Sequence, residues 1–145
     1  MSRRRACGLD YGGARVGVAV SDELGLLAHP RPFLPAEPRG ELLRALKELV
    51  REDDIERFVV GLPLDMKGGE GPSARKARDF AQELANAVGL DVELWDERLS
   101  TVQANRALQS AEVSAKKAKK RIDSASAVVI LQAWLDQVAT TRGRP

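Results

Sequence analysis

Short apolar runs separated by turn residues fill the first part of the chain, a pattern typical of β-strands. Residues 6–10 (ACGLD) and 15–20 (RVGVAV) are two such runs, with a Gly-Gly pair between them. This spacing predicts a β-hairpin. A third run, residues 24–33, contains two prolines, which cannot donate ladder hydrogen bonds. We therefore expect it at an edge of the sheet.

The hydrophobic period then changes to that of amphipathic helices. Helical stripes are predicted for residues 42–50, for residues 73–88 with Gly89 as the stop, for residues from about 100 to 109, and for a last helix that starts near Asp123. Buried strands are predicted at residues 58–61 and 92–95. The order β-β-β-α-β-α-β-α-α indicates a mixed five-stranded sheet flanked by helices, in which the two crossover strands run parallel to the first. We expect one α/β domain over residues 1–145.

Composition narrows the class of protein. The chain has 145 residues, of which 43% are hydrophobic and 30% charged, and this balance is typical of a globular domain. No stretch reaches the roughly 18 apolar residues of a membrane span, and the N-terminus lacks the apolar core of a secretory signal. The single cysteine, Cys7, lies in an apolar run with no partner for a disulfide or zinc site. We expect a cytoplasmic protein with Cys7 in its core.

Positive charge is concentrated in one segment. The net charge is only +2, from 23 basic and 21 acidic residues, but the segment 116–121 holds five bases and no acid: Lys116, Lys117, Lys119, Lys120 and Arg121. Such a run fits either a contact with phosphate groups or a solvated face. Arg15, at the start of the second strand, is likewise either an exposed strand residue or a phosphate contact.

Acidic residues stand where the predicted strands end. Asp10 ends the first strand, and Asp96 and Glu97 end the last. Ligands of open α/β sheets bind outside the carboxyl ends of the parallel strands, so these acids are expected to approach each other there. Carboxylates brought together repel one another unless a cation binds between them. Oxygen ligands select Mg²⁺ or Mn²⁺ rather than zinc.

Asp123 is the third candidate, because the basic run ahead of it could deliver phosphates to the same place. Three carboxylates, a hard metal and a basic segment point to phosphodiester hydrolysis by metal-activated water. Structural roles remain open for each acid. Asp10 also fits a turn acid, Asp123 fits a helix N-cap, and one of Asp96 and Glu97 could serve only the amides of a helix N-terminus. We favour Glu97 as the ligand.

The glycine-rich stretch 67–72 (KGGEGP) is typical of a mobile loop, and we expect it over the same edge of the sheet.

Four motifs in order resemble the YqgF family, also called RuvX, whose members are Holliday-junction-resolvase-like proteins. The motifs are GLDYGGARVGVAVSD, VVGLPLDMKG, DERLSTVQA and KKRIDSASAVVILQAWL. The resemblance covers nearly the whole chain. It departs at Gly13 and Ala14, where the family often has Thr and Lys, and at Ser126, where it tends to have Ala.

The resemblance implies a ribonuclease H-like fold and a metal-dependent nuclease with Asp10, Glu97 and Asp123 as its acidic triad. Asp10 would bridge two Mg²⁺ or Mn²⁺ ions, and the other two acids would each hold one. The implied substrate is nucleic acid bound by Arg15 and residues 116–121, with maturation of the 5′ end of pre-16S rRNA in pre-ribosomal particles as the expected process. The chain would act as a monomer or homodimer.

Three other classes of function compete with this interpretation. A DNA-junction resolvase or repair nuclease is the older inference for the family. A non-catalytic nucleic-acid-binding module is disfavoured by the intact carboxylates, which would oppose phosphates without a metal. An actin-like ATPase would need two domains around its nucleotide, and 145 residues suffice for one.

Overall fold

A computed structural model describes residues 5–100 and 124–142 of the chain. The strands are β1 (Arg5–Tyr11), β2 (Arg15–Ser21), β3 (Ala28–Pro35), β4 (Ile55–Leu62) and β5 (Asp91–Asp96). The helices are α1 (Arg39–Asp53), α2 (Pro72–Val88) and α4 (Ala125–Arg142), with a short 3-10 turn, η1 (Glu97–Leu99), after β5. The helix expected at residues 100–109 lies outside the described residues, as do Asp123 and the basic segment 116–121.

The five strands form one mixed sheet in the order β3-β2-β1-β4-β5. The first three strands pair antiparallel, and β4 and β5 run parallel to β1 because each is reached through a helix. This arrangement confirms the expected α/β fold with a mixed five-stranded sheet. The carboxyl ends of β1, β4 and β5 therefore meet at one edge, which we call the carboxyl edge.

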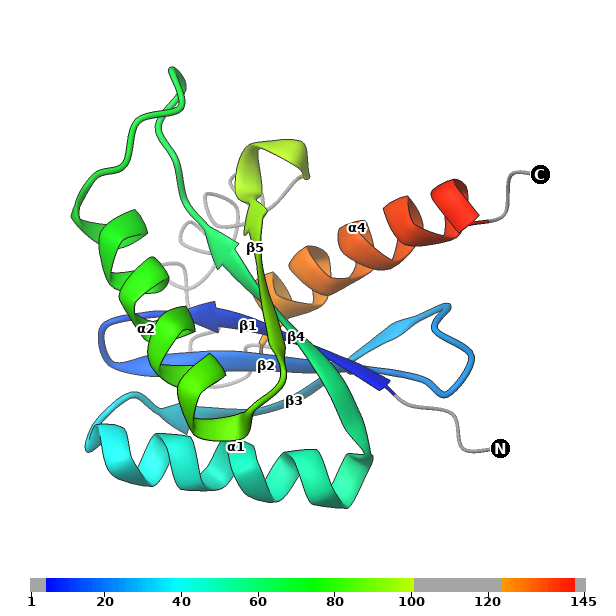
Figure 1. The fold of residues 1–145 in the computed structure, drawn as a ribbon. Coiled ribbons are helices and arrows are strands. Elements are labelled where there is room, and N and C mark those ends of the chain that lie inside the picture. Colours follow the sequence, from blue (N-terminus) through cyan, green and yellow to red (C-terminus); the bar gives the residue numbers. More distant parts are fainter. Residues whose placement is uncertain (1–4, 101–123, 143–145) are drawn as a thin grey trace, which may run out of the picture.

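Helices cover both faces of the sheet (Figure 1). Leucines and alanines of α1 and α2 pack with Phe58 and Phe80 into the larger core cluster on one face. On the other face, Ile130 and Leu131 of α4 pack on Val59 and Trp95. Gly8 allows α4 to lie close to β1, since a Cβ there would stand 2.7 Å from the Cβ of Leu131. Within the described ranges, no helix is long and apolar enough to cross a membrane.

The third strand begins later than the sequence pattern suggested. It was expected over residues 24–33, but residues 24–27 form the tip of the β2–β3 hairpin and β3 starts at Ala28. The Asp22 carboxylate accepts hydrogen bonds from the backbone N–H groups of Leu26 and Leu27, and Gly25 adopts a positive φ of 72°. These contacts close a turn, so the leucines there are exposed. The edge position of the proline-bearing strand is confirmed.

Candidate active site

Asp10 lies near the carboxyl end of β1 on the face that α4 covers. Side chains alternate along a strand, and Ala6 belongs to the α4 core cluster, so Asp10 points to the same face. Across the antiparallel pair it faces Gly17 of β2. A Cβ at Gly17 would stand 3.5 Å from the Cβ of Asp10. The absence of a side chain at residue 17 thus leaves space beside the Asp10 carboxylate.

Glu97 is the first residue of η1, directly after β5, and its side chain turns back over the sheet. It is only 1% exposed, which is exceptional for a glutamate. A Cβ at Gly61 of β4 would stand 2.5 Å from Glu97 Oε2 and 2.6 Å from Ile130 Cδ1. The carboxylate therefore occupies the space that any side chain at residue 61 would fill.

The two carboxylates approach the same residue of β4, Gly61, from the strands on either side of it. Leu9 pairs with Val60, which sets Asp10 level with Gly61 in the next strand. On the other side, Gly61 pairs with Trp95, two residues before Glu97. Neighbouring strands are about 4.8 Å apart, so both acids stand within one strand spacing of the Gly61 backbone. The expectation that strand order brings these two acids to one edge is confirmed.

Ser124, the residue before α4, is hydrogen-bonded to two strands of the sheet beside Asp10. Its Oγ accepts a hydrogen bond from the backbone N–H of Val18 (2.7 Å) and donates one to the carbonyl oxygen of Arg31 (2.7 Å). The register of β2 and β3 shifts between Val16 and Val18, and the hydroxyl bridges the strands there. The Ser124 Cα would stand 3.4 Å from a Cβ at Gly17, opposite Asp10. This contact fixes the start of α4 next to the first carboxylate.

Asp96 has the structural role that the sequence left open for one of the two neighbouring acids. Its Oδ1 accepts a hydrogen bond from the backbone N–H of Arg98 (2.9 Å), and its carboxylate pairs with the Arg98 guanidinium (Nη2 to Oδ2, 2.7 Å). The hydrogen bonds from the Arg98 side chain lower the pKa of Asp96 below its usual value. Asp96 therefore caps η1, while Glu97 faces the site.

The donor set at this edge suits a divalent cation. Both groups supply carboxylate oxygens, which suit Mg²⁺ or Mn²⁺. A Cβ at Gly61 would displace the Glu97 carboxylate, so this glycine lets the second carboxylate reach the edge. The part of the chain with described coordinates contains no group of three His, Cys, Asp or Glu residues that could hold a metal. Asp123, the third expected ligand, lies outside that part.

Arg15 stands at the same edge, exposed at the start of β2. It is two residues from Gly17 and so shares the face of Asp10. Its guanidinium carbon lies 4.2 Å from the ring centroid of Phe33, a cation–π contact with β3. This position leaves Arg15 available to a ligand that crosses the carboxyl edge. The other expected basic contacts, residues 116–121, are not among the described residues.

Sequence reasoning missed two residues of this edge, Ser124 and Arg98, and it placed Gly61 at the end of a strand without assigning it a role. A glycine inside a buried strand signals the close approach of another group, so Gly61 carried a usable signal. The contacts of Ser124 and Arg98 join segments far apart in the chain, and no local pattern marks them.

Known proteins resemble this chain over most of its length. A protein-family model described as "RuvX: Holliday junction resolvase" matches residues 4–137. A protein of Halothermothrix orenii named "Putative pre-16S rRNA nuclease" is 44% identical over 132 residues, which cover 91% of this chain and 94% of that protein. A Bacillus cereus protein of the same name is 47% identical over 135 residues, covering 92% and 98% of the two chains.

Solved structures show the same fold at low sequence identity. RuvC of T. thermophilus, solved in complex with a Holliday junction substrate, superposes with a TM-score of 0.61 at 17% identity. The match covers 95% of this chain and 97% of that one. A second Thermus thermophilus RuvC structure gives a TM-score of 0.56 at 16% identity, covering 96% of each chain.

Proposed function

The chain belongs to the RuvX family, and from this premise we propose that it is a metal-dependent nuclease that hydrolyses phosphodiester bonds in the 5′-end processing of pre-16S rRNA. The observation that carries the proposal is the approach of Asp10 and Glu97 to Gly61 at the carboxyl edge. Carboxylates that come together at the ends of parallel strands are the ligands that Mg²⁺ and Mn²⁺ prefer. The substrate follows the names of the close relatives.

Asp10, Glu97 and Asp123 are the residues that would hold Mg²⁺ or Mn²⁺. Asp123 lies outside the described residues, and support for it comes from the motif KKRIDSASAVVILQAWL within the range that the family model matches. The bound metal would lower the pKa of a water molecule and offset the charge of the phosphate. A two-metal arrangement, with Asp10 shared, is the finer form of the same proposal.

The chain's own residues would bind and orient the strand. Arg15 would contact a phosphate at the β2 side of the edge, where its guanidinium is held over Phe33. Residues 116–121 would bind backbone phosphates through their positive charge, and such binding is independent of base sequence. The packing of Glu97 against Gly61 and Ile130 would keep bulk water away from its carboxylate. Together these residues would position a scissile phosphate at the two carboxylates.

Resolution of DNA junctions is the second candidate, because the family model carries that description. Cutting two strands of a junction would need two active sites, hence a homodimer, whereas trimming an rRNA end needs one. We place the activity in the cytoplasm, in one domain over residues 1–145, with nucleic acid or a pre-ribosomal particle as the partner.

A strand panel tests the proposed function. End-labelled single-stranded RNA that carries a pre-16S 5′ extension, single-stranded DNA and a four-way junction are each incubated with the protein in Mn²⁺, Mg²⁺ or EDTA. Cleavage of the RNA that EDTA abolishes is the expected result. Preferential cutting of the four-way junction would instead identify the protein as a junction resolvase. Binding without cleavage in every metal would reject the nuclease and favour a non-catalytic module.

A further inference from the structure

The β4–α2 loop, residues 63–71, is a closed structure despite its three glycines. The Asp65 Oδ1 accepts hydrogen bonds from the backbone N–H groups of Lys67 (2.9 Å) and Gly69 (2.7 Å). Two backbone bonds, Asp65 N–H to Gly69 O and Gly68 N–H to Asp65 O, complete the turn. Gly68 has a φ of 89°, which suits glycine. The composition predicted a mobile loop, whereas the structure shows a turn ordered around Asp65.

Arg98 fastens this turn to the segment that carries Glu97. Its guanidinium is bound by Asp96, and Nη1 also donates to the carbonyl oxygen of Met66 (3.4 Å). A Cβ at Gly68 would stand 3.4 Å from the same Nη1, so the guanidinium lies flat against the turn. The loop tip is therefore fixed relative to Glu97 by a single side chain.

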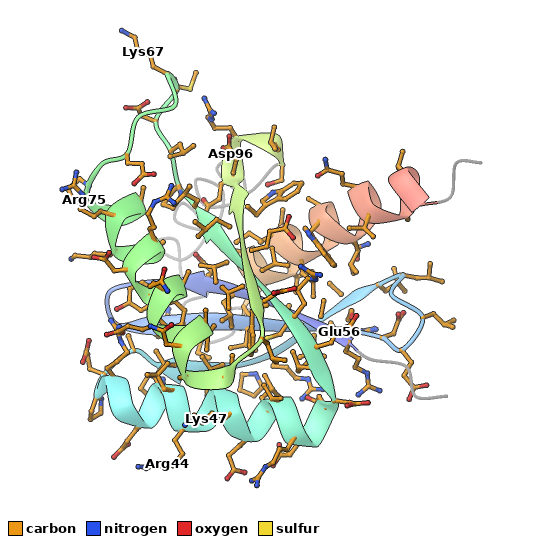
Figure 2. The ribbon with its side chains drawn as sticks, viewed as in Figure 1. Arg44, Lys47, Glu56, Lys67, Arg75 and Asp96 are labelled. Carbon is orange, nitrogen blue, oxygen red and sulfur yellow. The ribbon has the colours of Figure 1, made fainter. Side chains whose placement is uncertain are left out.

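The tip extends past the carboxyl edge, where Figure 2 shows Lys67 as its outermost labelled side chain, above Asp96. Met66 beside it is 88% exposed. The acids around the tip are compensated: Asp65 by backbone N–H groups, Asp96 by Arg98 and Glu70 by Arg78. Lys67, by contrast, has no ion pair within the described ranges. The loop presents an apolar side chain and an uncompensated cation at a fixed place beside the site.

We propose that this loop is a preformed nucleic-acid contact, in which Lys67 binds a phosphate of the substrate strand next to the cleavage point and Arg98 holds the loop in place. The inference rests on the proposed nuclease function and adds a contact on the α2 side of the edge, opposite Arg15. By strand order, Arg15 of β2 and the loop after β4 lie on either side of Asp10 in β1, so a strand that crosses the edge at Asp10 would meet both. The matched control is Lys47, an exposed lysine on α1 at the opposite end of the molecule (Figure 2).

Binding of fluorescent single-stranded RNA in EDTA tests the contact at several salt concentrations. Lys67→Ala should weaken binding about two- to fivefold, a typical effect for one exposed charge pair. It should also reduce the log–log salt slope by about 0.7, the value for one phosphate contact of a single strand. Lys47→Ala should change neither. Equal affinities and slopes for the two variants would overturn the proposed contact.

The role of Arg98 is tested in the same assay. Arg98→Gln should weaken binding, and Lys67→Ala should have a smaller effect in that background than in the wild-type chain. Full additivity of the two changes would overturn the positioning role of Arg98. Acetylation footprinting adds a readout without cleavage: bound RNA should protect the Lys67 amine and leave the Lys47 amine reactive. If the wild-type protein binds no RNA or DNA at all, the proposed function itself fails together with this contact.

Discussion

At the scale of single residues, the site depends on the absence of a side chain at residue 61, which is glycine. Glu97 Oε2 lies only 2.5 Å from the position that a Cβ of residue 61 would take, which is too close for a real contact. Ile130 of α4 packs against the same position. Both neighbours would have to move if residue 61 had a side chain. Burial of the Glu97 carboxylate and its reach toward Asp10 thus follow from one glycine.

Gly61→Ala is predicted to displace Glu97 and to slow cleavage strongly. A misplacement of about 1 Å at a reacting site costs roughly 10²-fold in rate, and overpacking of a core costs about 1–3 kcal/mol. Cleavage kinetics and urea unfolding measure the two effects. Gly40→Ala is the control, because nothing lies within 4 Å of its Cβ position on α1. Wild-type cleavage by Gly61→Ala would show that Glu97 needs no such space.

The two described acids were predictable, and their surroundings were not. Asp10 and Glu97 follow apolar runs, so their place at strand ends could be read from periodicity. The sequence pattern favoured Glu97 over Asp96, and the structure adds a physical reason, which is the ion pair of Asp96 with Arg98. Likewise, the exposed Arg15 could be placed at the edge, but its contact with Phe33 arises only when β2 and β3 pair.

At the scale of elements, the start of α4 is fixed by one hydroxyl group. The Ser124 side chain bridges β2 and β3 where their register shifts, and it adopts a φ of 61° that turns the chain into the helix. Because Ser124 also lies next to Gly17, this anchor determines how the last helix meets the site. Helix and strand positions followed from the hydrophobic period, as for α2 over Pro72–Val88. The tip of the β2–β3 hairpin was misassigned because its leucines are apolar but exposed.

Ser124→Ala should destabilise the protein by about 1–3 kcal/mol, because the buried N–H of Val18 would lose its hydrogen-bond acceptor. Urea unfolding followed by circular dichroism measures the change. Ser126→Ala serves as the control: Ser126, in the first turn of α4, is also buried, and the described hydrogen bonds include none from its hydroxyl. Equal stabilities of the two variants would contradict the anchoring role of Ser124.

At the scale of the whole molecule, the sheet separates two cores, and Cys7 reports on the larger one. Its thiol is fully buried, and this burial raises its pKa far above the ordinary value of 9.0. At a pH above 9.0, the Cys7 thiol of the unfolded chain loses its proton, whereas the thiol of the folded chain keeps it. Stability must therefore fall as pH rises, by about 1.4 kcal/mol per pH unit from this group.

Cys7→Ala should remove this alkaline component, so that unfolding free energies at pH 9 to 10.5 depend less steeply on pH. In the native wild-type protein, the thiol should react with a disulfide reagent only as fast as the protein unfolds. Fast labelling under native conditions would contradict the burial of Cys7.

Binding of the whole strand is expected to depend on segment 116–121 more than on any other basic group. Replacing Lys116, Lys117, Lys119 and Lys120 by Ala should weaken RNA binding and flatten its salt dependence, because fewer counterions are released. A control of equal charge replaces Arg44, Lys47, Arg51 and Lys76 on α1 and α2. An unchanged salt slope in the first variant would make the segment a solvated face.

The family and the fold were both predictable at this scale, since four ordered motifs and one α/β pattern cover most of the chain. The convergence at the carboxyl edge was predictable only in outline. The sequence alone does not show which glycines make space for the carboxylates, because this depends on packing between segments such as β4 and α4.

The most direct test of the account compares binding and cleavage by Asp10→Asn. The substitution removes a charge from the proposed metal site but keeps the size of the side chain. The account predicts that Asp10→Asn binds RNA at least as tightly as the wild type and cuts it in neither Mn²⁺ nor Mg²⁺. Asp79→Asn, an exposed change on α2, should leave both properties unaltered. Cleavage by Asp10→Asn at the wild-type rate would contradict the central claim that this carboxylate drives the reaction.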